Sequence, residues 1–251
     1  MRWVRRRRGE SEVEALRAEV RDLRTQVRRL RGRDRPDLGY LFVVTYGRSG
    51  STLLTGVLNG IPGFVVRGEN RGAVYHLFEF HRTMLRESKR ASRKTLRQHT
   101  HSFFGIGDFP PQQSLAGLRR LLLDTVLRPT PETRVTGFKE IRWAQPDLAE
   151  YVAWLREVFP GARFVVNTRD HADVAKSKWW GEHDRDDVAH RLAEIERRIL
   201  GVADGLGEAA YRVHYDDYVA DPTVLRGLFD WLGEPWDEEA VRETLAVRHS
   251  F

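Results

Sequence analysis

The chain has 251 residues, of which 41% are hydrophobic and 31% charged, so it can build one α/β core and an appendage. It contains no cysteine, which excludes disulfide bonds, thiolate-zinc sites and cysteine nucleophiles. The net charge of +6 arises in residues 1–36, which hold 13 arginines and six acidic residues, whereas the rest has 29 basic and 30 acidic residues. We therefore expect no nucleic-acid partner for the folded domain. No apolar run approaches the ~20 residues of a membrane span and the N-terminus is polar, so we expect a cytoplasmic protein.

Residues 1–36 are predicted to form a basic arm with a coiled-coil helix. Apolar residues recur there at alternating steps of three and four, with valine at heptad position a and leucine at position d. They are Val13, Leu16, Val20, Leu23, Val27 and Leu30. This pattern favours two parallel helices, so we expect a homodimer joined through the arm. The alternative is a single amphipathic helix packed on its own domain. The leading arginine run permits weak contact with an acidic membrane surface, although such runs are more often solvated tails.

The first predicted strand, residues 40–44 (YLFVV), leads into the turn TYGRSGSTLL, Thr45 to Leu54. A helix follows, and we expect it to end in a left-handed cap at Gly60. Gly47 and Gly50 allow the backbone to approach a ligand closely, and the free N–H groups at the helix start attract negative charge. The side chains that add donors or positive charge are those of Arg48, Ser49, Ser51 and Thr52. The turn is therefore predicted to bind an anion.

Two other interpretations apply to this turn. A nucleoside triphosphate loop of the form G-x-x-x-x-G-K-[ST] needs a glycine where the chain has Thr45 and a lysine where it has Ser51, so that class of site is excluded. The remaining alternative is an ordinary strand-to-helix turn with a serine cap.

Beyond the turn, apolar runs alternate with helical patterns, which is typical of a parallel sheet covered by helices. Further strands are expected in 63–69, 134–143, 162–168 and 211–218, and helices in 75–98, 147–159, 184–206 and 222–233, with a glycine- and proline-rich loop from 99 to 114. We expect residues 37–251 to form one domain of this α/β class.

A second predicted anion site follows the strand 162–168. Arg169 stands at the carboxyl end of this strand, and Ser177 lies about two turns into a helix that Asp170 is expected to cap. Ligands of open α/β sheets bind at that edge. The alternative is that Arg169 pairs with Asp170 or Asp173 next to a surface serine.

Five segments together resemble a known family. TYGRSGSTLL is similar to the 5′-phosphosulfate loop of the sulfotransferases that use 3′-phosphoadenosine 5′-phosphosulfate (PAPS), and RFVVNTRDHADVAKS is similar to their 3′-phosphate motif. RGEN, GFKEIRW and YDDYVADP…LFDWLG also resemble family segments, in the family's order, so the resemblance covers about residues 39–236. It implies the sulfotransferase fold, a P-loop-like parallel sheet flanked by helices, with PAPS as co-substrate and no metal ion.

The resemblance implies roles for individual donor-site residues. Residues 48–52 would hold the 5′ group through their N–H groups and hydroxyls. Arg169 and Ser177 would hold the 3′-phosphate, and Tyr215 matches a residue that contacts adenine in the family.

The resemblance also implies catalytic residues. Glu69 is similar to the base of bacterial carbohydrate sulfotransferases and would take the proton of an acceptor hydroxyl. Its alternative role is a salt bridge to Arg67 or Arg71. Glu140 is the second candidate base. The side chains that would stabilise charge on the leaving group are those of Arg48 and Lys139.

Three departures from the cytosolic branch favour the bacterial or carbohydrate-type branch. Leu53 replaces a tryptophan, Ile141 replaces a catalytic histidine, and the chain ends without a basic glycine segment. The expected acceptor is a hydroxyl of a carbohydrate or other natural product, in a site lined by residues 75–115, Trp179 and Trp180. The alternative function is a non-catalytic nucleotide-binding or coiled-coil scaffold module that keeps the fold.

Overall fold

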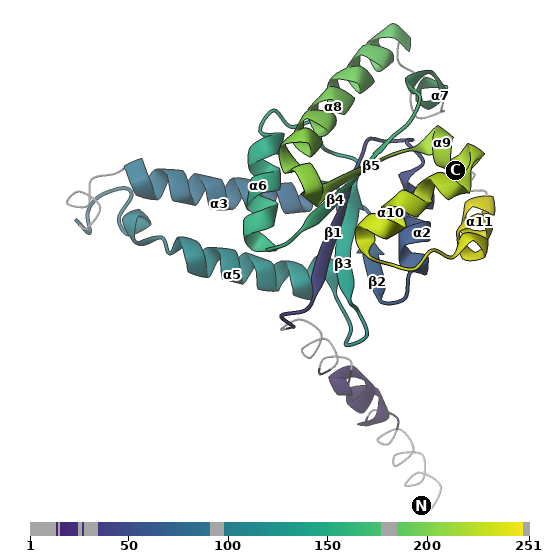
Figure 1. Ribbon diagram of the computed structural model, residues 1–251. Coiled ribbons are helices and arrows are strands. Elements are labelled where there is room, and N and C mark those ends of the chain that lie inside the picture. Colours follow the sequence, from purple (N-terminus) through teal and green to yellow (C-terminus); the bar gives the residue numbers. More distant parts are fainter. Residues whose placement is uncertain are drawn as a thin grey trace, which may run out of the picture.

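Five parallel strands form one sheet in the computed structural model, which describes residues 14, 16–24, 27, 35–90, 98–176 and 185–247. The strands are β1 (Gly39–Val44), β2 (Phe64–Arg67), β3 (Val135–Glu140), β4 (Arg163–Thr168) and β5 (Ala210–His214). Their order is β2-β3-β1-β4-β5, and each neighbouring pair is parallel. All five predicted strands are thus confirmed, and their carboxyl ends meet at one edge of the sheet (Figure 1).

Helices cover both faces of this sheet (Figure 1). They are α2 (Ser51–Gly60), α3 (Ala73–Arg90), α5 (Pro111–Leu122), α6 (Leu148–Val158), α7 (His171–Ala175), α8 (Arg185–Leu206), α9 (Tyr215–Ala220), α10 (Arg226–Leu232) and α11 (Glu238–Ala246). Short turns of helix occur at η1 (Ile106–Asp108), η2 (Leu123–Leu127), η4 (Gly207–Ala209) and η5 (Pro222–Leu225).

The central strand β1 explains why these segments form a sheet. Phe42 and Val44 face an apolar cluster that includes residues of α3, α5, α6 and α8, whereas Leu41 and Val43 face a cluster with residues of α2, α10 and α11. Because both faces of the strand are buried, apolar and polar residues do not alternate along it, and its sequence is one apolar run.

Three local expectations were wrong. Residues 111–114 belong to α5 rather than to a loop, because Pro111 occupies the first turn, where a missing N–H costs nothing. Gly60 does not form a left-handed cap: α2 is followed by Ile61 in an extended conformation, and the left-handed residue of this turn is Gly63 at φ 81°. The last strand ends at His214, because Asp216 and Asp217 lie in the first turn of α9, where carboxylates favour a helix start.

The described residues of the N-terminal arm, 14, 16–24 and 27, are helical. Leu16, Val20, Leu23 and Val27 are 45–56% exposed, so these four seam residues do not pack on the domain, contrary to the single-helix alternative. The remaining seam residues and the leading arginine run lie outside the described residues. Among the helices of the described residues, none combines the length and the apolar character needed to cross a membrane.

Candidate active site

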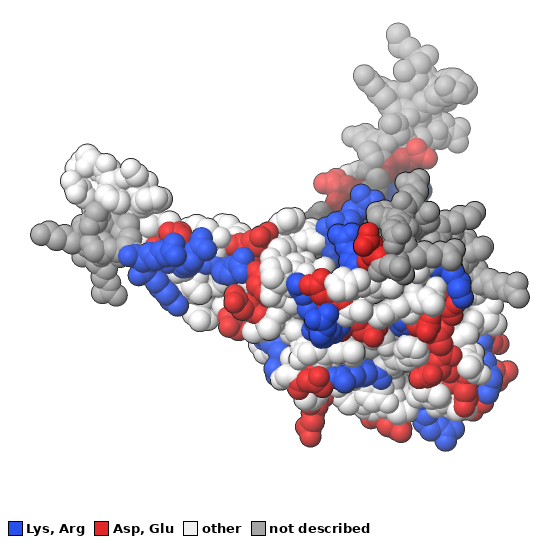
Figure 2. Space-filling model, turned by 90° about the horizontal axis from the view of Figure 1, so that it is seen from above, with Lys and Arg blue, Asp and Glu red and all other residues white. Residues whose placement is uncertain are grey.

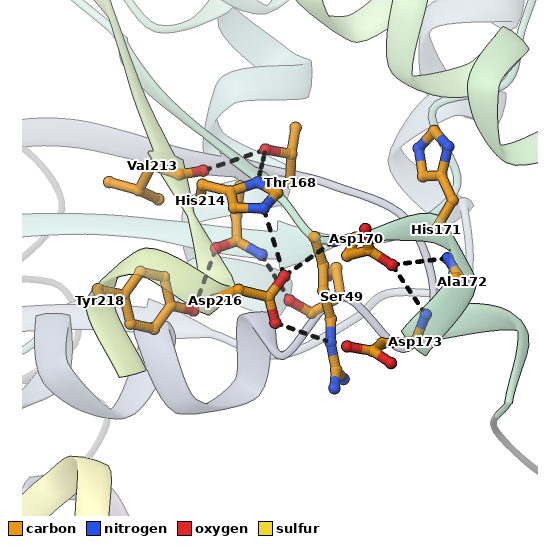
Figure 3. Close-up of polar contacts among 12 residues, drawn as sticks. Ser49, Thr168, Asp170, His171, Ala172, Asp173, Val213, His214, Asp216 and Tyr218 are labelled. Carbon is orange, nitrogen blue, oxygen red and sulfur yellow. Dashed lines mark hydrogen bonds and ion pairs between the residues drawn. The ribbon is translucent and has the colours of Figure 1, made fainter. Parts of the chain in front are cut away.

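A buried hydrogen-bond network fixes the turn between β1 and α2 (Figure 3). The Thr45 and Ser49 hydroxyls lie 2.6 Å apart, and Thr45 Oγ1 is 2.7 Å from the Asn167 carbonyl oxygen. Asn167 Nδ2 donates to the Ser49 carbonyl at 2.9 Å, while Tyr218 donates to Asn167 Oδ1 at 3.1 Å. These four side chains are fully buried, so the first loop is tied to β4 and α9. Sequence analysis missed Asn167, although a polar residue inside the apolar run of β4 was a visible signal.

The turn exposes backbone donors at its outer side. Arg48 and Gly50 adopt left-handed conformations, with φ of 67° and 76°. Gly50 is the N-cap of α2 and no side chain caps the helix, so the first N–H groups of α2 can bind an anion. Arg48 and Thr52 are exposed, whereas Ser51 is nearly buried and the Ser49 hydroxyl is turned into the interior.

Gly50 also lies against the ring of Tyr215. A Cβ at position 50 would stand 2.0 Å from Tyr215 Cδ2, far inside van der Waals contact. Glycine is therefore required both for the backbone conformation and for the close approach of this ring. The predicted adenine contact thus borders the predicted 5′ loop.

Arg169 connects the two predicted anion sites. Its Nη1 donates to the Arg48 carbonyl oxygen at 3.1 Å, and its guanidinium carbon lies 4.3 Å from the centroid of the Tyr215 ring. The nearest carboxylate contact is Asp216, with Arg169 Nε 3.8 Å from Asp216 Oδ1. Arg48, Arg169 and Tyr215 are therefore brought together, whereas Ser177 lies outside the described residues.

The alternative partners expected for Arg169 are engaged elsewhere. Asp170 caps α7 by accepting from the N–H groups of Ala172 and Asp173, as predicted. The Asp173 carboxylate accepts from Lys176 at 2.6 Å, and this hydrogen bond lowers the pKa of Asp173.

Two carboxylates that sequence analysis missed support the backbone around Arg169. Asp216 Oδ2 accepts from the Asp170 N–H at 2.9 Å and lies 3.3 Å from His214 Nε2. Glu196 lies 2.6 Å from the Tyr46 hydroxyl, which in turn accepts from the Arg169 N–H at 2.8 Å. Burial, and next the hydrogen bond to Glu196, raises the pKa of Tyr46, so its hydroxyl remains protonated. No sequence pattern pointed to Glu196, which lies on α8, far along the chain.

On the other side of β1, Lys139 and Glu69 form an ion pair. Lys139 Nζ donates to Glu69 Oε1 at 2.6 Å, and the two side chains are 8% and 36% exposed. Arg67, one of the two partners in the alternative salt bridge, instead donates to the carbonyl oxygens of Leu127 and Arg128. The two predicted catalytic residues thus lie together, with the carboxylate reachable from solvent.

Glu140 has a different environment from Glu69. Its buried carboxylate accepts from the N–H groups of Asn70 and Gly72 at 3.1 and 3.0 Å, and from those of Ile141 and Arg142 at 2.8 and 3.3 Å. Four donors saturate its two oxygens, so Glu140 fixes the loop that carries Glu69 and is poorly placed to accept a proton from a substrate.

The predicted walls of an acceptor site are only partly described. Trp179 and Trp180 lie outside the described residues. The loop around residues 98–110 lies at the outer end of the α3 and α5 hairpin, away from the carboxyl ends of the strands (Figure 1). The start of α3 follows the Glu69 loop directly, and Asn70 Oδ1 lies 3.3 Å from the Val74 N–H there.

This sheet edge combines three cations and a helix N-terminus with two accessible carboxylates, Glu69 beside Lys139 and Asp216 beside Arg169. Arg48 and Arg169 follow the ends of β1 and β4, and Lys139 is the next-to-last residue of β3. Such a site suits a ligand with two separate anionic groups and leaves Glu69 available for proton transfer.

Comparison with known proteins identifies the family of the chain. A model of the sulfotransferase family matches residues 41–238. The sulfotransferase domain of the Synechococcus PCC 7002 olefin synthase has a similar fold, with a TM-score of 0.52 and 20% identity over 86% of this chain and 80% of that chain. A sulfotransferase domain from the curacin biosynthetic pathway has a TM-score of 0.49 and 22% identity, covering 80% of this chain and 76% of that chain. Sulfotransferase STF9 from Mycobacterium avium has a TM-score of 0.49 and 16% identity, covering 87% of this chain and 70% of that chain. No relative is found among curated proteins. Because the family model covers most of its length, the chain belongs to the sulfotransferase family.

Proposed function

We propose that the protein transfers a sulfuryl group from PAPS to a hydroxyl of a carbohydrate or other small natural product. The observation that carries this proposal is the contact of Arg169 with both the Arg48 carbonyl and the Tyr215 ring. This contact brings the loop proposed for the 5′ anion, residues 48–52, and the cation proposed for the 3′ anion, Arg169, to one sheet edge. This family generally uses PAPS, whose two anionic ends need two such sites.

The residues present fit this donor. The 5′ phosphosulfate would be held by the N–H groups of residues 49–52 and the hydroxyls of Ser51 and Thr52, while Ser49 would contribute only its backbone. Arg169, with Ser177 as a further predicted ligand, would hold the 3′-phosphate. The ring of Tyr215 would contact adenine.

Glu69 would act as the general base. As the acceptor oxygen bonds to sulfur, its proton passes to the Glu69 carboxylate and the sulfur–oxygen bond to the phosphate breaks in line. The products are a sulfate ester and adenosine 3′,5′-bisphosphate. Arg48 and Lys139 would stabilise the charge that develops on the leaving oxygen, so the proposal needs no metal ion.

The test is calorimetric titration with adenosine 3′,5′-bisphosphate, with AMP as the ligand control. We expect binding of the bisphosphate to be at least ~10-fold tighter than that of AMP, and to be lost in Arg169→Ala. Arg163→Ala is a matched control, because Arg163 lies at the other end of β4 and stacks on Trp231 at 4.9 Å. Equal binding of the two nucleotides, or full binding by Arg169→Ala, contradicts the donor site.

We also propose that the arm joins two chains through its heptad seam. The four described seam residues, Leu16, Val20, Leu23 and Val27, are exposed in a single chain, and pairing would bury them.

A further inference from the structure

The α3 and α5 hairpin carries an exposed apolar end. Its inner part packs on α6, where Tyr75 and Arg82 contact Asp147. Its outer end projects from the rest of the domain (Figure 1). There Phe103 and Phe104 are each 57% exposed, which makes them the most exposed large apolar side chains described from residue 35 onward. These two adjacent exposed rings belong to neither apolar cluster of the described residues, and such rings favour contact with an apolar phase.

The same part of the chain carries a concentrated positive charge. Residues 82–110 contain seven basic and two acidic residues, a net charge of +5, whereas the rest of residues 37–251 contains 22 basic and 28 acidic residues, a net charge of −6. In Figure 2 basic side chains lie along the hairpin, and the described residues at its end are uncharged. Lys89 and Arg90 are exposed in the last turn of α3, and the acidic residues of this stretch are Glu87 and Asp108.

We propose that the outer end of this hairpin docks on an anionic phospholipid surface. Phe103 and Phe104 would enter the boundary between headgroups and acyl chains, while Lys89 and Arg90 at the end of α3 would attract the acidic headgroups. Neither the apolar rings alone nor the basic residues alone would give stable membrane contact. The hairpin supplies both within one short segment.

Two other occupants are disfavoured by the charges. A nucleic acid running beyond the hairpin would meet a domain with a net charge of −6, and it offers no apolar phase for adjacent phenylalanines. A second copy joined tip to tip would bring two like-charged hairpins together. A lipid surface contacts only the tip and leaves the acidic body in water.

The absence of cysteine allows a clean test with the full chain. Ser102→Cys places one thiol at the exposed tip, where an NBD dye reports the polarity of its surroundings. Val224→Cys is the control, because Val224 is 47% exposed and lies on η5. With vesicles of equimolar phosphatidylcholine and phosphatidylglycerol, we expect the dye at position 102 to brighten and shift to the blue. Neither pure phosphatidylcholine nor a dye at position 224 should give this response.

Vesicle sedimentation then assigns the interaction to side chains. We expect the pair Phe103→Ser and Phe104→Ser, and separately the pair Lys89→Glu and Arg90→Glu, to weaken binding about 10-fold or more. Leu121→Ser should bind as the wild type does, because Leu121 is a single exposed residue, 43% exposed, at the inner end of α5. The N-terminal arm is present in every variant, so its contribution cancels.

Several outcomes would overturn the proposal. They are an unchanged dye at position 102 on anionic vesicles, an equal response at position 224, and wild-type sedimentation of both paired variants. A dye response that grows with protein concentration without vesicles would identify a second copy instead. The same response to duplex DNA, with DNA displacing vesicles, would identify a nucleic acid.

Discussion

Lys139 Nζ lies 2.6 Å from Glu69 Oε1, and this pair joins the carboxyl ends of two neighbouring strands. Lys139 belongs to β3, and Glu69 follows the end of β2 by two residues. In the proposed reaction the two residues act in sequence. When Glu69 accepts the acceptor's proton it becomes neutral, its hold on the ammonium weakens, and Lys139 is released toward the negative charge on the leaving oxygen. Proton removal and leaving-group stabilisation are thereby coupled.

The first prediction concerns Glu69→Gln. Glutamine keeps the size and can still accept from Lys139, but it cannot take up a proton. We expect kcat to fall about 10²- to 10⁴-fold with adenosine 3′,5′-bisphosphate affinity nearly unchanged. The measurement is release of the bisphosphate with the best acceptor from a panel of hydroxylated compounds.

Glu79→Gln is the control for this change, because Glu79 pairs with His76 on the surface of α3. Undiminished turnover in Glu69→Gln would show that another group is the base. Bisphosphate binding with no turnover by the wild type on any acceptor would support the non-catalytic alternative.

The second prediction separates Glu140 from Glu69. Glutamine at position 140 offers one oxygen to four N–H donors and turns an NH₂ group toward two of them. We expect the free energy of unfolding to fall by about 2 kcal/mol or more, because buried donors lose their acceptor. Urea unfolding measures this loss. Glu150→Gln is the control, since Glu150 is 69% exposed and should change stability little. An unfolding curve identical to that of the wild type would contradict the structural role of Glu140.

The third prediction concerns Gly50→Ala. The new Cβ would collide with the Tyr215 ring, and alanine is disfavoured at φ 76°. Displacement of Tyr215 would also disturb Arg169, which stacks on it. We expect bisphosphate affinity to fall about 10-fold or more. Gly60→Ala, at the other end of α2, meets nothing within 4 Å and should bind normally. Normal binding by Gly50→Ala would mean that the donor does not use this loop.

The sequence predicted the sheet well because buried parallel strands are apolar on both faces, as in β1 and β4. It supplied candidate site residues but not the contacts among them. Pairing of β2 with β3 places Arg67 opposite Phe138, and only this register brings Glu69 beside Lys139. The role of Glu140 depends on N–H groups from two loops about 70 positions apart, which leave no pattern in the sequence.

The fourth prediction concerns pH. His81 on α3 is 3% exposed and lies 3.1 Å from the Ser114 hydroxyl on α5. Desolvation by burial lowers the pKa of His81 below the ordinary value of 6.5. This effect outweighs the attraction of Glu157, which raises the pKa. Between the folded and unfolded pKa values the unfolded chain binds more protons, so stability falls as pH drops below about 6.5. His81→Gln should therefore lose less stability than the wild type between pH 8 and pH 5, measured by urea unfolding at each pH. The exposed His76→Gln should retain the wild-type dependence, and the same slope in His81→Gln would contradict the argument.

The fifth prediction concerns the arm. Leu16 and Leu23 occupy position d of the heptad and are 56% and 51% exposed in the single chain. In a parallel pair of helices each would insert into a hole on the partner, so a carboxylate there would be buried without a counter-charge. We expect the wild type to have the mass of a dimer in sedimentation equilibrium and the double variant Leu16→Asp and Leu23→Asp that of a monomer. Ala18→Asp, at the outer position f, adds charge to the same helix and should remain dimeric. A double variant that stays dimeric would show that another surface joins the chains, and a monomeric wild type would show that the seam does not pair.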